Sequence, residues 1–253
     1  MTLEELITEL RENILHDRSD RTDGDTDQMW SDAALVRYIN EAQTRFARQT
    51  YALRDGQTVA ATRITLVDGV DIYALHPSVL AVISAQPEGS RMALARAGFS
   101  QFAEPPPQQS AFFDPQNVHL PRPGPPLAYS VDETFLESSA GPLEAGTIRI
   151  YPVPDADAAG TVVQLRVIRT PIAKLTLENM AGVPEIPEMY HLSLLDWAAY
   201  LALRVVDLDA GMPDRAMEFR ASFEQTVNEV RKETLRKRRA PMTWGFGRFR
   251  WER

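Results

Sequence analysis

The four histidines are the side chains of this sequence best suited to hold a metal ion, but their spacing does not form a site. They stand far apart in the chain, at His16, His76, His119 and His191. His191 lies in a stretch with helical patterning, yet the H-E-x-x-H pattern that places two ligands on one helix face is missing. The chain has no cysteine, which excludes disulfides, thiolate catalysis and cysteine-ligated metals together. We therefore expect no metal and no cofactor.

Other signatures of catalysis are also missing from the sequence. There is no G-x-S-x-G elbow, no P-loop and no G-x-G-x-x-G pattern, and the glycines of "WGFGRF" have a different spacing. The acidic run "DRSDRTDGDTDQ" (17–28) lacks the residue order of an EF-hand, so we interpret it as a solvated loop. Glu4 and Glu5 fit the electrostatics of a helix start. Two glycosidase carboxylates leave no local signature, but no feature favours such a pair, and we expect a protein without enzymatic activity.

The most unusual stretch is the basic, aromatic segment 236–253. It holds seven basic residues and one acid, whereas the rest of the chain holds 20 basic and 34 acidic residues. A body with a formal charge of −14 therefore carries a tail with a charge of +6. Because an acidic body repels a nucleic-acid backbone, this distribution argues against a general DNA-binding domain.

Four interpretations of this tail are open. A membrane anchor is disfavoured, because Pro241, Gly245 and Gly247 interrupt any continuous amphipathic helix. A nucleic-acid arm is chemically reasonable, since arginine neutralises phosphate and aromatic rings stack on bases. The third interpretation is a tail that stays solvated or packs on its own chain and has no partner. We favour the fourth, docking into another protein, with aromatic anchors and with basic residues that pair to acids of the partner. The residues expected to make this contact are Arg236, Lys237, Arg238, Arg239, Trp244, Phe246, Arg248, Phe249, Arg250 and Trp251.

The remaining composition is that of an ordinary globular protein, with 44% hydrophobic and 25% charged residues. The first residues, "MTLEELITELRENILHD", are acidic and amphipathic, unlike a secretory signal peptide. No run approaches the roughly 18 apolar residues of a membrane span. We expect a soluble protein that is made in a cytoplasm.

Two helices are predicted near the N-terminus. Thr2 and Glu5 form an S/T-x-x-E capping box, in which each side chain satisfies a free backbone N–H of the other residue. Apolar residues at helical spacing follow and give one buried face. A second helix is predicted to begin after Ser31, a good N-cap, with Trp30 packed onto Leu35.

The region 53–180 has the alternating pattern of short strands. "ITLVDGVDIYAL" predicts a hairpin around Asp68-Gly69, because that turn needs a positive φ. Further strands are predicted in "SVLAVISAQ", "LAYSVDETFL", "GTIRIYPVP" and "TVVQLRVIRTP", and a short helix in "GFSQFAE". The segment 105–126 holds eight of the 18 prolines, too many for a central strand or helix, so we interpret it as a crossing segment.

Helical patterning returns at 181–235 as a hairpin of two helices. The first is apolar nearly all round and must be buried on several sides. Its narrow polar stripe includes Asp196, Tyr200 and Arg204, which we interpret as a polar seam at a subunit contact. Asp196 and Arg204 lie two turns apart, too far to pair with one another, so each needs another partner. The last helix is predicted to begin at Pro213.

These elements predict an α+β fold in which a small β-sandwich or barrel module is inserted into a helical bundle. The bundle consists of N-terminal helices (1–52) and a C-terminal hairpin (181–235). The β-module occupies 53–180, and the tail 236–253 follows.

Three stretches, in order and spacing, resemble one known family. "WSDAALVRYINEAQTRFA" resembles a W-x-D-x-x-L-x-x-x-I-N-x-A helix. "IRIYPVPDADAAGTVVQLRVIRTP" is similar to a strand–P-x-P-D–strand–R-x-P passage, and "IPEMYHLSLLDWAAYLAL" is similar to the I-P-x-x-Y-H-x-x-L-x-x-x-A helix that follows it. The family is that of tailed-phage head–tail adaptor proteins, also called portal-proximal connector or neck proteins. The likeness covers 3 to about 235, without the segment 105–126.

The resemblance implies a structural virion protein, a ring-forming adaptor that joins the portal to the tail. Its implied partners are further copies of the chain in a ring, typically twelvefold, the portal protein, and tail or nozzle proteins, with no membrane. DNA is then expected to pass through the acidic channel without specific binding. The implied location is the virion neck, after assembly in the host cytoplasm, with segment 236–253 docked on the portal. The alternative is a nucleic-acid-binding packaging or regulatory protein that uses the basic tail.

Overall fold

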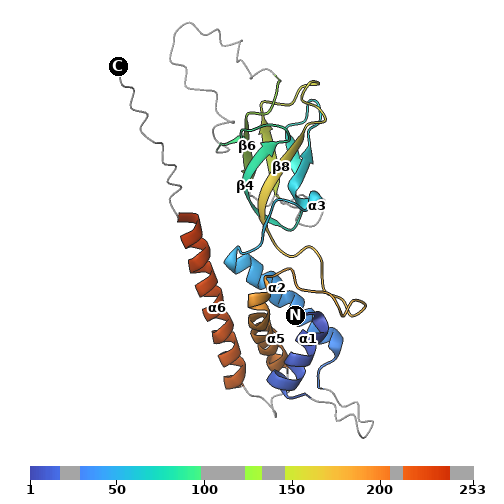
Figure 1. Cartoon of the computed structure of the whole chain (residues 1–253), viewed down its shortest axis with the longest axis vertical. Helices are drawn as coiled ribbons and strands as arrows, with labels where there is room; N and C mark the ends of the chain where they lie inside the picture. The colour runs from blue at the N-terminus through green and yellow to red at the C-terminus, as the bar shows by residue number, and fades with distance from the viewer. Residues whose placement is uncertain (18–28, 98–122, 133–145, 206–212, 240–253) are drawn as a thin grey trace, which may run out of the picture. The chain divides into compact units, whose positions relative to one another are not determined.

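The computed structural model describes residues 1–17, 29–97, 123–132, 146–205 and 213–239 (Figure 1). The chain divides into two compact units. The first joins Met1–Ala52 to Leu175–Arg253, and the second is Leu53–Lys174. Each unit has a hydrophobic core of its own. Long helices make up most of the first unit and two small sheets most of the second, so the predicted α+β class is confirmed.

The helices of the first unit begin where their capping residues place them. Its helical segments are α1 (Leu3–Glu9), the π-helical continuation η1 (Leu10–Leu15), α2 (Asp32–Thr50), the 3-10 turn η2 (Glu188–Tyr190), α5 (His191–Val205) and α6 (Pro213–Arg239). The predicted capping box is present, because the Glu5 N–H donates to Thr2 Oγ1 at 3.3 Å and the Thr2 N–H donates to Glu5 Oε2 at 2.9 Å. Ser31 caps α2 by accepting from the Ala34 N–H at 3.3 Å.

The core of the first unit surrounds α5, which lies between α1 and α6 (Figure 1). Leu195 and Ala198 of α5 are completely buried, together with Leu6 of α1 and Ile39 of α2. Burying a leucine or isoleucine side chain contributes about 1.5–3 kcal/mol, so this central helix holds its neighbours mainly by apolar contact. The prediction that this helix is buried on several sides is confirmed.

A buried cation connects η1 to the start of α2. Arg11 donates to Asp17 at 2.7 Å, to Asp32 at 2.6 Å and to the Trp30 carbonyl at 2.7 Å. The interpretation of the acidic run as a solvated loop is wrong for its first residue, because the Asp17 side chain is only 7% exposed. Its carboxylate is drawn inward by the buried guanidinium, which needs a counter-charge.

The second unit contains two small sheets. In the first sheet three strands pair antiparallel with β8 (Val162–Arg169). They are β1 (Arg54–Asp55), β2 (Arg63–Thr65) and β4 (Val79–Pro87). The short helix α3 (Val59–Thr62) lies between β1 and β2 in the chain. In the second sheet the order is β3 (Ile72–Ala74), β7 (Thr147–Tyr151), β6 (Ala128–Asp132) and β5 (Ala95–Arg96), with β5 parallel to β6. Both sheets contribute side chains to one core. The strands predicted at β4, β6, β7 and β8 are confirmed.

The hairpin predicted around Asp68-Gly69 is wrong in its pairing. Gly69 has the positive φ of 72° that such a turn requires. However, β2 pairs with β8 in one sheet, and β3 pairs with β7 in the other. An isolated two-stranded hairpin has marginal stability in water. Here the chain passes from one sheet to the other between β2 and β3, and Leu66 and Leu75 are buried in the shared core.

An ion pair fixes β1 on β8. The Asp55 carboxylate accepts from Arg169 Nε at 2.6 Å and from the backbone N–H groups of Gln57 and Thr58 at 2.8 and 3.0 Å. Burial alone raises the pKa of Asp55, but these hydrogen bonds and that of the Thr58 hydroxyl outweigh it and hold the pKa well below its usual range.

Two predicted features lie outside the described residues. They are the short helix in "GFSQFAE" (98–104) and nearly all of the proline-rich segment 105–126. No helix among the described residues has both the length and the hydropathy needed to cross a membrane.

Candidate functional site

The three predicted contact residues of α5 lie where this helix packs on α6, and the structure gives each of them a partner. Asp196 accepts a hydrogen bond from Ser222 of α6 at 2.8 Å. Arg204 donates to the Tyr200 hydroxyl at 3.5 Å, and its guanidinium carbon lies 5.6 Å from the centre of the Tyr200 ring. Asp196 and Arg204 are therefore not paired with one another. Burial raises the pKa of Asp196, and the hydrogen bond from Ser222 opposes that shift.

Aromatic side chains form the surface on which these polar residues lie. The ring of Trp197 is 4.9 Å from that of Tyr200 and 5.2 Å from that of Phe223, which is completely buried. Phe46 of α2 contacts Phe223 at 6.3 Å. These rings join α2, α5 and α6, so they hold the surrounding side chains on a rigid base.

Arginines from two other helices lie on the same aromatic surface. The guanidinium carbon of Arg45, on α2, lies 3.9 Å from the centre of the Trp197 ring. That of Arg220, on α6, lies 5.9 Å from the centre of the Tyr200 ring. Arg220 is also paired with Glu224 at 2.9 Å. A cation over an aromatic face gains about 0.5–2 kcal/mol, depending on its desolvation.

Polar atoms near this surface lack partners within the part of the chain that the structure describes. Arg45 Nε, Trp197 Nε1 and Gln49 Oε1 are buried there without a hydrogen bond. Trp197 is only 4% exposed. A buried polar group without a partner is costly, so these three atoms reduce the stability that the packing of the three helices provides.

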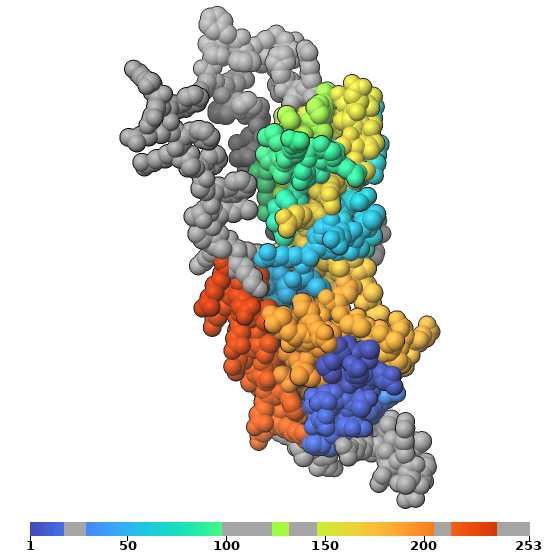
Figure 2. All heavy atoms as spheres, viewed as in Figure 1, coloured from blue at the N-terminus to red at the C-terminus, as the bar shows by residue number. Residues whose placement is uncertain are grey.

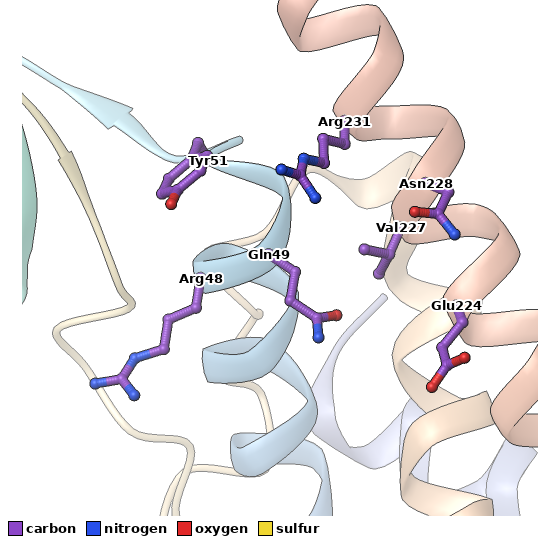
Figure 3. A pocket seen from close by; sticks show the side chains of 7 residues that line it. All are labelled: Arg48, Gln49, Tyr51, Glu224, Val227, Asn228 and Arg231. Carbon is purple, nitrogen blue, oxygen red and sulfur yellow. The ribbon is translucent and has the colours of Figure 1, made fainter.

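An open cleft of about 320 Å³ continues this surface between the end of α2 and the middle of α6 (Figure 3). It is lined by Arg48, Gln49, Tyr51, Glu224, Val227, Asn228 and Arg231. Figure 3 shows the side chains of Gln49 and Arg231 extending into the space between the two helices, whereas Arg48 extends to the other side of α2. Arg231 is exposed, and no described acid lies within ion-pair distance of it.

These contacts define one continuous surface, which we call the arginine groove. Its charged residues are Arg45, Arg204, Arg220, Arg231 and the acids Asp196 and Glu224. Guanidinium groups bind carboxylates through paired hydrogen bonds, so the groove is suited to an acidic partner. Arg204 is predictable from its helical stripe, whereas the other arginines are not, because contacts between helices leave no local pattern.

The predicted docking tail is only partly described. The helix α6 continues to Arg239, so the basic run begins on its last turns, where cations favour the helix dipole. Arg236 is exposed. The side chains of 237–239 and all of 240–253, with the predicted aromatic anchors, lie outside the description.

The described histidines have structural contacts. His191 is 1% exposed, with Nε2 2.8 Å from the Ile186 carbonyl and Nδ1 3.3 Å from the Met1 ammonium. Burial lowers the pKa of His191. His76 bonds to Ser78 at 2.8 Å. Within the described ranges, no three His, Asp or Glu side chains form a group that could hold a metal ion.

The comparison with known proteins gives one family. No curated protein matches the chain. The family model described as SU10 adaptor protein matches residues 1–245, a range that includes every described residue of both units. The chain therefore belongs to the SU10 adaptor protein family.

Proposed function

We propose that this protein is a structural adaptor of a bacteriophage virion, and that it forms a ring between the portal and the tail. The observation that carries the proposal is the family match over residues 1–245, which extends through the helical unit, the β-unit and half of the basic tail. An adaptor acts by contact with other virion proteins, so its function depends on the surfaces that bind them.

The helical unit supplies a surface suited to ring formation. The arginine groove presents cations from α2, α5 and α6, in a chain whose formal net charge is −8. A contact between two different patches of neighbouring copies closes into a ring when its rotation allows. Tyr200 and Arg204 lie in this groove, which supports the proposal that they contribute to the subunit contact.

The tail is the proposed contact with the portal. The helix α6 ends at Arg239, so the segment 240–253 follows it directly in the chain. Trp244 and Trp251 are the proposed anchors, since buried aromatic residues contribute most at protein interfaces. DNA passes through the ring without specific binding, in keeping with the acidic body.

A pull-down with isolated portal rings tests this proposal. The full chain is expected to join the portal in a complex of fixed stoichiometry, and a chain without 236–253 is expected to stay free. Filter binding with duplex DNA at physiological salt tests the alternative. Submicromolar, steeply salt-dependent binding that disappears with the same deletion, together with no portal complex, would favour a nucleic-acid-binding protein.

A further inference from the structure

One face of the first sheet carries polar side chains that are exposed or half-exposed. The opposite face supplies Val82, Leu165 and Val167 to the core of the β-unit. Because side chains alternate along a strand, the residues between these core positions point outward. We call this outer surface the basic sheet face, and its residues are Arg54 of β1, Arg63 of β2, Ser84 and Gln86 of β4, and Gln164 and Arg166 of β8.

The strands that form the basic sheet face are neighbours at the surface of the β-unit. β8 pairs with β4 along one edge and with β1 and β2 along the other. In Figure 2 parts of the green segment that contains β4, the yellow segment that contains β8 and the cyan segment that contains β1 and β2 lie next to one another. A hollow of about 600 Å³ opens on this face, and Arg54, Gln86, Gln164 and Arg166 are among the residues that line it.

The sheet has an excess of positive charge when all of its charged residues are counted. Its four strands contain Arg54, Arg63, Arg166, Arg169 and one acid, Asp55, and the segment 56–62 between β1 and β2 has no charged residue. Asp55 also lines the hollow, but Arg169 binds it at 2.6 Å, so this pair is neutral. The exposed Glu88 follows the end of β4. With that acid included, four arginines and two acids give a formal charge of +2, in a chain whose formal charge is −8.

Three arginines of the face can be reached by a partner. The side chains of Arg54, Arg63 and Arg166 are all exposed. Within the part of the chain that the structure describes, no acid lies within ion-pair distance of any of them. A guanidinium group binds a carboxylate through paired hydrogen bonds, so each of the three can bind one carboxylate of a partner.

The same three arginines lie in a row with regular spacing. Arg63 is opposite Gln164 of β8, and Arg54 is opposite Ile168. These positions of β8 are about 14 Å apart at about 3.4 Å per residue, and Arg166 lies midway between them. An extended polypeptide places the side chains of one side every two residues, about 7 Å apart. Acids at positions i, i+2 and i+4 of such a segment therefore match the row.

The amides of the face favour a polypeptide over a nucleic acid. Gln164 Nε2 donates to the Gly56 carbonyl at 2.8 Å, and Gln86 Nε2 donates to the Ser90 carbonyl at 2.6 Å. The two Oε1 atoms remain as acceptors, which suit the backbone N–H groups of a polypeptide and not the oxygens of a phosphate. The four strands contain no aromatic residue on which bases could stack. A DNA duplex, with one charge per about 1.7 Å of its axis, would extend beyond this short row over an acidic chain.

We propose that the basic sheet face binds an extended acidic segment of another virion protein, with glutamates or aspartates at alternate positions. Arg54, Arg63 and Arg166 each bind one carboxylate, and Gln86 and Gln164 accept hydrogen bonds from the backbone of the segment. The identification of the partner as a virion protein rests on the proposed function, whereas the chemistry of binding does not.

Fluorescence anisotropy of dye-labelled peptides, titrated with the full chain at low salt, tests this proposal. The peptide TETETET has three glutamates at alternate positions. TTEEETT has the same charge, but its middle glutamate points to the opposite side of an extended chain. TQTQTQT has no charge. We expect TETETET to bind most tightly, TTEEETT more weakly, and TQTQTQT not measurably.

Paired variants of the full chain show whether the named arginines are responsible. Arg54→Gln with Arg166→Gln is expected to weaken the binding of TETETET about tenfold, because two charged contacts are lost. The control, Arg37→Gln with Arg48→Gln, changes the net charge equally at two exposed side chains of α2 and is expected to bind like the wild type. Circular dichroism melting curves establish that both variants are folded.

The inference is overturned if TETETET does not bind, if it binds no better than TTEEETT, or if the variant at Arg54 and Arg166 binds it like the wild type. A DNA duplex that binds where the peptides do not, and that is lost with the same variant, would assign the face to nucleic acid. The portal pull-down separates these failures from that of the proposed function. A chain that joins the portal but does not bind TETETET keeps the adaptor role and loses this contact. A chain that binds TETETET but never joins the portal keeps the contact and loses the role.

Discussion

The guanidinium carbon of Arg45 lies 3.9 Å from the centre of the Trp197 ring, and no acidic side chain among the described residues pairs with it. This relationship joins α2 to α5 and leaves the Arg45 side chain half-buried over a buried ring. Its charge is therefore available to a partner, and its stem contributes to the fold.

The two contributions of Arg45 can be separated by Arg45→Met. Methionine keeps an apolar chain over Trp197 and removes the charge, so we expect the free energy of unfolding to change by less than about 1 kcal/mol. Self-association is expected to weaken, because the groove loses a cation. Urea unfolding followed by tryptophan fluorescence, with sedimentation velocity on the same samples, measures both. A large loss of stability with unchanged association would assign Arg45 to the fold alone.

The Arg11 cluster is expected to be essential to the helical unit. Arg11→Met leaves Asp17, whose side chain is 7% exposed, without its cation, so we expect the free energy of unfolding to fall by about 3–5 kcal/mol. Trp30 lies beside this cluster and reports its unfolding by fluorescence in urea. The exposed Arg37 provides the control, since Arg37→Met is expected to change stability by less than about 0.5 kcal/mol. Equal effects of the two substitutions would contradict this assignment.

The ion pair of Asp55 predicts an acid-sensitive β-unit. Because folding lowers the pKa of Asp55, its stabilisation is complete above the unfolded value of about 4 and is lost as the pH falls toward the folded value. Asp55→Asn is expected to lower the free energy of unfolding by about 3 kcal/mol at pH 7, and by less as the pH falls below about 4. Urea unfolding followed by far-ultraviolet circular dichroism, with hydrogen exchange of the β8 amides, measures this difference. A difference that stays constant down to pH 3 would show that the carboxylate charge is not its cause.

If segment 236–253 docks on the portal, its aromatic side chains should contribute more to attachment than its basic side chains. Trp244→Ala with Trp251→Ala is expected to abolish attachment, because truncation of a buried aromatic anchor costs about 2 kcal/mol or more per site and the ring repeats the loss. Arg236→Gln with Arg238→Gln is expected to weaken attachment in a salt-dependent way only, since exposed ion pairs contribute about 0–1 kcal/mol each. Portal pull-downs at low and high salt compare the two. Wild-type binding by the aromatic variant would mean that the tail does not dock through these rings.

Local interactions were predictable from the sequence, and pairings between distant segments were not. The capping box of Thr2 and Glu5 and the N-cap Ser31 follow from residues three positions apart. The strands flanking Gly69 were correctly placed near a turn, but each pairs with a distant strand because both sheets need its apolar face.

The candidate site shows the same limit. Tyr200 and Arg204 lie four positions apart on one helix, so their shared stripe was predictable from the sequence. Arg45 reaches Trp197 from another helix, more than a hundred residues away in sequence, so only the packing of the helices brings them together. The ion pair between the buried Arg11 and the half-exposed Asp32 likewise joins two separate helical segments.

Cryo-electron microscopy of the virion neck tests the adaptor role most directly. We predict a ring of this chain between the portal and the phage tail, with the segment 236–253 of each copy on the portal. A neck without density for this chain, in particles that contain portal and tail, would contradict the central claim.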